Sequence, residues 1–439
     1  MCGGQTAATI VKCPLDLRTR RLRRVETPFF MTTDMMEKKD GRAWPGRILW
    51  LCLCGTMLFS LVSISVAQIF LAAGLAAWLL LLVVEKKRPE FPAFFPILLA
   101  YGGLSLLSSA FSIDPAMSFK DSRELLLYLV VPMAFTAFIS VPRLRAGTAC
   151  LLVSALAACG YTLYLFFLKA APGERATGFM SHTMTQGGLL MLFTLAALAL
   201  FLFLGERLRW VWAAAMVPAL ACLALTRTRS AWLGLFIGGT VLIGLYRPKL
   251  LVVPPLLLGL FFALSKPLGE RYSLIQDLRE RSLSIFSLKD KSNQDRLEYL
   301  RAGWKVITLR PLLGTGPDTV DEVFTDPALA LSSHAARNVH LHNNLVQIAA
   351  ERGLPAAAAW LAFLAWAAVS ALRLHRRAGP WQRALGGAAL AAAISLFVSG
   401  FFEYNFGDSE ITVLFLVLIT LPHALNAGAA KTQAGVPDR

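Results

Sequence analysis

Charged residues are scarce in this sequence of 439 residues. Asp, Glu, Lys and Arg together make up 16% of it, whereas soluble globular domains contain about a quarter. Hydrophobic residues make up 56% and the mean hydropathy is +0.58. Apolar runs near the length of a bilayer-spanning helix recur between residues 48 and 425. A soluble core does not account for so many separate runs, so the composition predicts an all-α polytopic membrane protein.

Signals for several kinds of site are absent as well. The seven cysteines fall in the N-terminal segment or within apolar runs and show no zinc-type spacing. A disulfide framework is therefore not expected. No phosphate-loop pattern occurs, which argues against ATP hydrolysis. We expect no metal and no cofactor.

The apolar runs predict about twelve membrane spans. These are residues 48–65, 67–84, 92–111, 124–141, 147–168, 186–204, 210–226, 231–246, 250–265, 354–372, 383–402 and 411–426. The resulting organisation is an N-terminal segment 1–47, nine spans within 48–265, a long loop 266–353, three spans within 354–426 and a short tail 427–439, which looks disordered.

Basic residues orient these spans. Alternate connections are short and basic, as in EKKRPE (85–90), GERLR (205–209) and RLHRR (373–377), and such loops are typically cytoplasmic. Both termini then lie in the cytoplasm, and the long loop lies outside it. The N-terminal segment holds ten bases against five acids, which favours a topological anchor over nucleic-acid binding. It does not look like a cleaved signal peptide.

The long loop predicts a small helical subdomain. Residues 271–287 and 293–308 have helical periodicity, and the second segment places Leu297, Leu300, Trp304 and Ile307 on one apolar stripe. RPLLGTGPDTV (310–320) predicts a turn.

Several arginines lie in predicted outer segments, against the usual charge bias of membrane proteins. Among them are Arg175, Arg229, Arg296 and Arg301. The planar donor fork of a guanidinium group binds two phosphate oxygens at once, so these residues are candidates for phosphate recognition. In the alternative interpretation they pair with neighbouring acids or extend to lipid headgroups.

Polar residues gather in VHLHNNLVQIAAERGLP (339–355), just before an apolar run. If a helix begins here, Asn343 or Asn344 can cap its start. His342 then lies at the entrance of the helix. Taken alone, such a histidine is either a structural hydrogen-bonding group or a catalytic base.

Three elements, in this order along the chain, resemble the O-antigen ligase and polymerase superfamily. They are LTRTRSAWLGLFIGG (225–239), DRLEYLRAGWKVITLRPLLGTGPDTV (295–320), and His342–Asn343 followed after nine residues by Gly353. The resemblance runs from about residue 173 to residue 405. It implies a GT-C-like bundle in the bacterial inner membrane that transfers a glycan from undecaprenyl diphosphate to a sugar hydroxyl of lipid A-core on the periplasmic face. In this role the enzyme is a glycosyltransferase of lipopolysaccharide biosynthesis.

The resemblance also suggests roles for individual residues. A histidine can accept a proton near neutral pH, so His342 is expected to be the base of an inverting transfer, with His340 as a second candidate. Arg229 and Arg296 are expected to bind the donor diphosphate, with Arg175 and Arg301 in reserve. Asn343, Gly353 and Glu351 are interpreted as structural residues of the motif, Glu351 as a partner for an arginine.

Other interpretations of these residues remain. No acidic pair suited to a retaining or divalent-metal glycosyltransferase stands out, although a catalytic carboxylate among Glu351, Glu403 and Asp408 stays open. A metal held by the two histidines would need a third ligand that the sequence does not place. An O-antigen polymerase or a protein O-oligosaccharyltransferase would use the same donor, and a membrane transporter is the rival from another class. The sequence does not reveal the sugar, the accepting hydroxyl or the oligomeric state.

Overall fold

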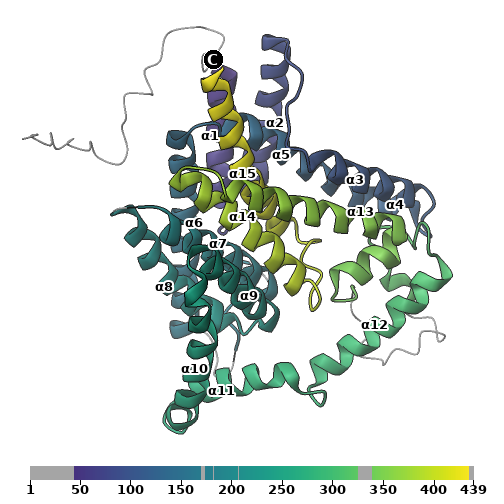
Figure 1. Cartoon of the computed structure of the whole chain (residues 1–439). Coiled ribbons are helices and arrows are strands. Elements are labelled where there is room, and N and C mark those ends of the chain that lie inside the picture. Colours follow the sequence, from purple (N-terminus) through teal and green to yellow (C-terminus); the bar gives the residue numbers. More distant parts are fainter. Residues whose placement is uncertain (1–43, 170–173, 181, 206, 325–338, 435–439) are drawn as a thin grey trace, which may run out of the picture. The chain divides into compact units, whose positions relative to one another are not determined.

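The computed structural model describes residues 44–169, 174–180, 182–205, 207–324 and 339–434, and these residues form helices and connections without a strand (Figure 1). The helices before the long loop are α1 (Trp44–Phe59), α2 (Ile64–Glu85), α3 (Phe95–Ala110), α4 (Pro115–Asp121), η2 (Ser122–Leu129), α5 (Val130–Ala137), α6 (Val141–Leu168), α7 (Thr183–Phe203), α8 (Leu208–Thr226), α9 (Arg229–Tyr246), η3 (Pro248–Val252) and α10 (Val253–Gly269). Those that follow are α11 (Ser273–Leu283), η4 (Ser284–Phe286), α12 (Lys291–Leu309), η5 (Asp321–Val323), α13 (Asn344–His375), α14 (Pro380–Ser399) and α15 (Ser409–Gln433). The predictions for residues 1–43 lie outside the described residues.

Nine helical segments in the described ranges are long and apolar enough to cross a membrane. They are α2, α6, α7, α8, α9, η3 with α10, α13, α14 and α15. Two more of the twelve predicted spans correspond to the shorter apolar helices α1 and α3. The prediction of an all-helical polytopic membrane protein is confirmed, whereas the count of twelve stays a prediction.

Three boundaries differ from the expectation. The fourth predicted span, 124–141, is not one α-helix but the 3₁₀ segment η2 followed by the short helix α5. Helix α6 begins at Val141 and not at residue 147, because Pro142 suits the first turn of a helix. Helix α15 continues to Gln433, so the first part of the tail, which looked disordered, is helical. Its alanines favour helix strongly.

Helices α7, α14 and α15 form the centre of the bundle, and most of their residues are buried. Alanines along α14 let its neighbours α7, α9, α13 and α15 approach closely. On α9, Gly234 and Gly238 face Ser395 of α14. The hydroxyl group of Ser395 donates to the carbonyl of Gly234 at 2.8 Å. A side chain at either glycine would force these two helices apart.

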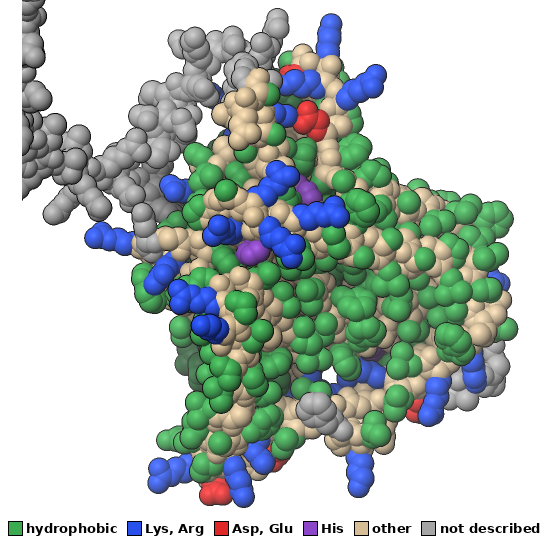
Figure 2. All heavy atoms as spheres, viewed as in Figure 1, with side chains coloured by type: hydrophobic (Ala, Val, Ile, Leu, Met, Phe, Trp, Pro, Cys, Tyr) green, Lys and Arg blue, Asp and Glu red, His purple; other side chains and the backbone are tan. Residues whose placement is uncertain are grey.

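The surface separates apolar from charged side chains. On the face shown in Figure 2, hydrophobic side chains cover a broad band, and lysines and arginines gather at its two edges. Exposed side chains along α2, α6 and α10 include Val83, Phe167 and Leu256. Such a belt suits the hydrocarbon core of a bilayer bounded by its polar interfaces.

Helices α10, α11 and α12 carry the chain away from the bundle and across its end opposite the end of α15, before α13 re-enters it (Figure 1). The two predicted loop helices are confirmed as α11 and α12. Of the apolar stripe on α12, Ile307 is buried, whereas Leu297, Leu300 and Trp304 are 40%, 38% and 67% exposed. The packed face carries Tyr299, Ala302, Gly303, Val306 and Ile307. Gly303 sits against Val346 of α13, so a small residue permits this contact.

Candidate active site

His342 pairs with a carboxylate from a distant part of the chain. Its Nδ1 atom lies 3.0 Å from Oε1 and 3.2 Å from Oε2 of Glu403, which follows α14. Glu403 is buried, whereas the ring of His342 is partly exposed. The backbone of His342 has a φ of 49°, a left-handed conformation that is uncommon for a residue other than glycine. The fold therefore holds this ring at some conformational cost against the carboxylate.

His340 contacts the same carboxylate. Its Nε2 atom lies 3.4 Å from Oε1 of Glu403, and the two imidazole rings have centroids 4.5 Å apart. Burial alone would raise the pKa of Glu403, but the hydrogen bonds and charges of His340 and His342 lower it to about 2. Burial tends to lower the pKa of His340, yet the hydrogen bond and charge of Glu403 raise it overall. Glu403 is thus an ionised group shared by two imidazoles.

The three side chains also meet a geometric requirement for a metal site. One ligand atom from each of His340, His342 and Glu403 lies within 4.8 Å of the others. The sequence placed no third ligand beside the histidines, and the fold places Glu403 there. Imidazole nitrogens and a carboxylate oxygen are donors that zinc accepts. This arrangement keeps a metal-dependent alternative open to experiment.

Two asparagines join the histidine segment to the chain after α14. Asn343 caps α13, because its side chain accepts a hydrogen bond from the amide of Val346 at 3.0 Å. The Nδ2 atom of Asn343 donates to the carbonyl of Phe401 at 3.1 Å. Asn344 donates to Asn405 at 2.7 Å. These bonds on both sides of Glu403 hold its backbone beside the histidines.

Gly353 marks a break within α13. Its φ of 82° is non-helical, and a Cβ at this position would collide with the carbonyl of Leu312. The turn segment around 310–317 passes close to this break. The amide of Leu354 donates to Pro311, and those of Thr315 and Gly316 donate to Ala350 and Glu351. The glycine of the histidine motif therefore provides room for the Pro-Leu-Leu-Gly-Thr-Gly turn.

Glu351 contacts an arginine that follows it directly. Its carboxylate lies 2.6 Å from Nη1 of Arg352 and accepts from Gln347 at 2.7 Å. Arg352 also contacts Asp121 at 2.9 Å and Tyr404 at 3.1 Å. Because Tyr404 follows Glu403, this buried network supports the carboxylate segment from its other side.

Of the two arginines expected to bind the diphosphate, Arg296 lies beside the histidine–carboxylate pair, whereas Arg229 contacts the segment that follows α11. Arg296 on α12 donates from Nε to the carbonyl of Phe402, next to Glu403, at 3.1 Å. Arg229 begins α9 and donates to the hydroxyl group of Ser284 at 2.8 Å. It also pairs with Asp290 at 3.1 Å. A carboxylate thus already contacts Arg229.

Arg175 contacts the turn between α8 and α9. It donates to the carbonyl of Thr226 at 2.8 Å and to the hydroxyl group of Thr228 at 3.1 Å. Burial and then the neighbouring cations Arg281 and Arg227 lower the pKa of Arg175 to about 10. Burial also lowers the pKa of Arg296; the charge of Glu403 opposes this effect, and those of Arg229 and Arg281 add to it. Such mutual repulsion indicates a region that attracts an anion.

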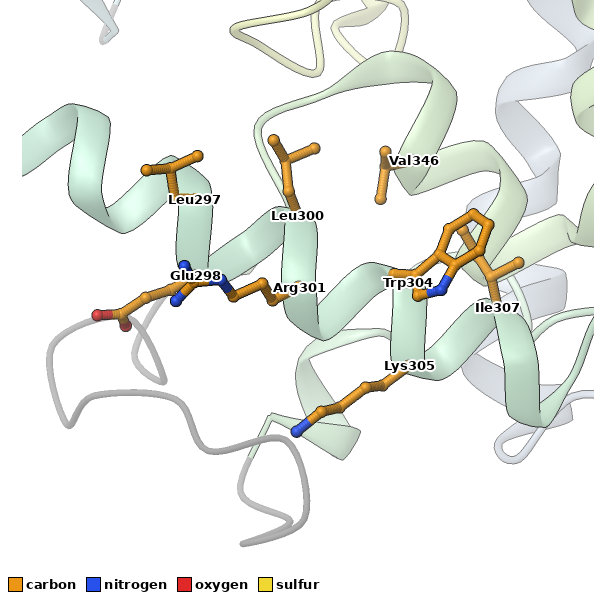
Figure 3. A pocket seen from close by; sticks show the side chains of 8 residues that line it. All are labelled: Leu297, Glu298, Leu300, Arg301, Trp304, Lys305, Ile307 and Val346. Atoms are coloured by element: carbon orange, nitrogen blue, oxygen red, sulfur yellow. The ribbon is translucent and has the colours of Figure 1, made fainter. Parts of the chain in front are cut away.

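Arg301 lies apart from this group of cations. It is exposed on α12 and lines an open hollow of about 660 Å³ together with Trp304, Lys305 and five other residues (Figure 3). No described contact joins it to Arg175, Arg229 or Arg296. The structure therefore does not bring the fourth predicted arginine to the candidate site.

Asp408 lies a few residues beyond Glu403 and precedes α15. Its Oδ2 atom accepts from the hydroxyl group of Thr185 on α7 at 2.9 Å. Burial raises the pKa of Asp408 to about 7, which the nearby charge of Glu403 reinforces and the bond from Thr185 opposes. No described contact joins Asp408 to either histidine of the motif.

Sequence reasoning missed the direct pairing of Glu403 with the histidines. It also missed the contacts of Ser284 and Asp290 with Arg229. The only sequence signal for Glu403 is its position in FFEYNFGDSE (401–410), a polar and acidic stretch between two apolar runs.

The fold defines a polytopic helical membrane protein, and its site combines an imidazole–carboxylate pair with a group of partly buried arginines. Residues 214–361 match the family model described as O-antigen ligase, which supports membership of the chain in the O-antigen ligase/polymerase superfamily. The resemblance drawn from the sequence motifs is thereby confirmed. The matched segment contains Arg229, Arg296, His342 and Gly353. A search of curated proteins gave no match.

Proposed function

We propose that the chain is an O-antigen ligase, which transfers a glycan from undecaprenyl diphosphate to a sugar hydroxyl of lipid A-core at the periplasmic face of the inner membrane. The observation that carries this proposal is the His342–Glu403 pair beside Arg296, within a superfamily of glycan ligases and polymerases. A general base and an anion-binding group are the two functions that this transfer needs.

His342 acts as the base in the proposed reaction. When Nδ1 of a neutral ring donates to Glu403, the lone pair of that ring is on Nε2. The acceptor hydroxyl attacks the anomeric carbon of the donor sugar and gives its proton to this nitrogen. Glu403 stabilises the imidazolium ion that forms, because its lowered pKa keeps it ionised.

The arginines stabilise the leaving group. As the new glycosidic bond forms, the bond from the anomeric carbon to the diphosphate oxygen breaks, and its electron pair stays on that oxygen. The departing undecaprenyl diphosphate gains one negative charge. Fixed guanidinium groups such as Arg296 and Arg229 favour the state in which this charge has developed. A single displacement of this kind inverts the anomeric centre.

The rival functions differ in acceptor or class. A polymerase or a protein O-oligosaccharyltransferase would use the same donor and the same base, so the acceptor decides between them. The transporter alternative gains no support from the family match.

Reconstitution tests the proposed function. Purified protein is mixed with the lipid-linked glycan and lipid A-core, with EDTA present, and the ligated product is followed by mass. We expect product from the wild type and none from His342→Ala. Undiminished product from His342→Ala would contradict the role of His342 as the base. Loss of product in EDTA, with recovery on adding a divalent metal, would instead favour a metal held by His340, His342 and Glu403. If product forms only on a glycan chain, the chain is a polymerase. If product forms only on a protein, it is a protein O-oligosaccharyltransferase.

A further inference from the structure

Helix α11 and the residue that follows it contact the α8–α9 turn and the first residue of α9. Oδ2 of Asp277 on α11 lies 2.6 Å from Nη2 of Arg227. Just after α11, Ser284 accepts from Nη1 of Arg229 through its hydroxyl group at 2.8 Å and through its carbonyl at 3.1 Å. These contacts fix one face of α11 against the arginines of the α8–α9 turn.

Arg281 lies on that face, between the two contacts. It follows Asp277 by four residues, so the two side chains project from the same side of the helix. The hydroxyl group of Ser284, which accepts from Arg229, donates to the carbonyl of Arg281 at 2.8 Å. Arg281 is thus held beside Arg229 through a shared neighbour.

The guanidinium group of Arg281 lacks a direct carboxylate partner in the part of the chain that the structure describes. Its Nε atom is buried without a hydrogen-bond partner, and no carboxylate forms an ion pair with it there. Burial lowers the pKa of Arg281; Arg229 and Arg227 reinforce this effect, and the nearby charges of Asp290 and Asp277 oppose it. A partly buried cation beside two others is unfavourable unless an anion joins them.

The charges near Arg281 leave room for such an anion. Five arginines act on one another here, namely Arg175, Arg227, Arg229, Arg281 and Arg296. Three carboxylates oppose them among the described residues with which these arginines interact, namely Asp277, Asp290 and Glu403. Among these residues the cations outnumber the carboxylates. A diphosphate esterified at both ends carries two negative charges near neutral pH.

We propose that Arg281 is a further binding residue for the donor diphosphate, presented by α11 between Arg227 and Arg229. This inference rests on the proposed function, because that function supplies the diphosphate. Arg229 and Arg227 already contact Asp290 and Asp277, so Arg281 offers donors that no internal carboxylate occupies. Its fork binds two phosphate oxygens, whereas a lysine offers only a point charge.

Binding of undecaprenyl diphosphate to the purified full-length protein in detergent tests the proposal. Arg281→Gln should weaken binding about tenfold, and Arg281→Lys should weaken it less. Arg279→Gln is the matched control. It removes the same charge from α11, and Arg279 also has a buried Nε without a partner, but it lies two residues away and so on nearly the opposite side of the helix. The control should bind like the wild type.

Several outcomes separate this inference from the proposed function. If Arg296→Gln loses binding while Arg281→Gln binds like the wild type, Arg281 is not a ligand and the proposed function stands. Equal weakening by Arg279→Gln and Arg281→Gln would show a general effect of loop charge and overturn the inference. If the wild-type protein does not bind undecaprenyl diphosphate, both the inference about Arg281 and the proposed function are contradicted. Should Arg281→Gln not fold, Arg281→Lys decides, since unchanged binding by this variant contradicts a fork-specific contact.

Discussion

Nδ1 of His342 lies 3.0 Å from Oε1 of Glu403, although 61 residues and two long helices separate them in the chain. The contact joins the start of α13 to the segment after α14. Because the same carboxylate also contacts His340, the two imidazoles share one negative charge. From this contact we expect His342 to act as the base and Glu403 to stabilise the imidazolium ion that forms.

Glu403→Gln should lower kcat about 100-fold or more with little change in donor KM, because the amide cannot stabilise an imidazolium ion. Initial rates at saturating and limiting donor measure both constants. Glu410→Gln is a control in the neighbouring first turn of α15, and it should retain most of the activity. An unchanged kcat in Glu403→Gln would contradict the assigned role.

His342→Ala should abolish turnover while undecaprenyl diphosphate still binds, because the base does not hold the donor. His340→Gln should reduce turnover to a smaller extent, because His340 contacts Glu403 at the longer distance of 3.4 Å. Binding and turnover are measured on the same preparations. Equal losses of turnover in the two variants would mean that the histidines act as a unit.

Arg296→Gln should weaken donor binding about tenfold, an effect typical of one lost charge-assisted contact. The carbonyl of Phe402 also loses a donor, so kcat should fall as well. Titrations at several salt concentrations measure the effect, and the variant should depend less on salt than the wild type. Arg301→Gln, which lies apart from the other arginines, should bind donor normally.

Gly353→Ala should destabilise the protein by about 1–3 kcal/mol. The new methyl group meets the carbonyl of Leu312, and the positive φ adds strain. Thermal unfolding in detergent measures the change in melting temperature. Gly259→Ala in α10 is the control, because a Cβ at this position meets nothing within 4 Å and alanine favours helix. A similar melting temperature for both variants would show that the break in α13 tolerates a side chain.

Asp408→Asn should stabilise the protein more at pH 8 than at pH 5. The pKa of Asp408 is raised from an ordinary value of 3.8 to about 7 in the folded protein. An acid with a raised pKa costs folding free energy once it ionises, and the cost grows as the pH rises from about 4 through 7. Asparagine removes this cost and can still accept from Thr185. Melting temperatures of the wild type and of Asp408→Asn at the two pH values test this pH dependence. A stabilisation seen only at pH 5 would contradict the prediction.

The local motifs were predictable because their signals are local. Asn343 caps the helix that the sequence indicates, and the loop helices appear where the periodicity of 271–308 places them. Glu403 could not be assigned in this way. Its partner is set by the packing of α13 against α14, and no spacing rule links residues in different helices. The apolar stripe of α12 could not be assigned to a packed or an exposed face for a related reason, because large apolar side chains face lipid as readily as a protein core.

The α13–α14 hairpin carries the base at the start of one arm and the carboxylate just beyond the end of the other. The number of residues in each arm therefore sets the register of the catalytic pair. One residue added within α14 would shift everything after it by about 1.5 Å and turn it by about 100° about the helix axis, which exceeds the tolerance of a hydrogen bond. The connection at residues 376–379, at the far end of the hairpin, lies outside both arms and can vary in length. Helix length in this hairpin is thus as strict a requirement for chemistry as the identity of the two residues it brings together.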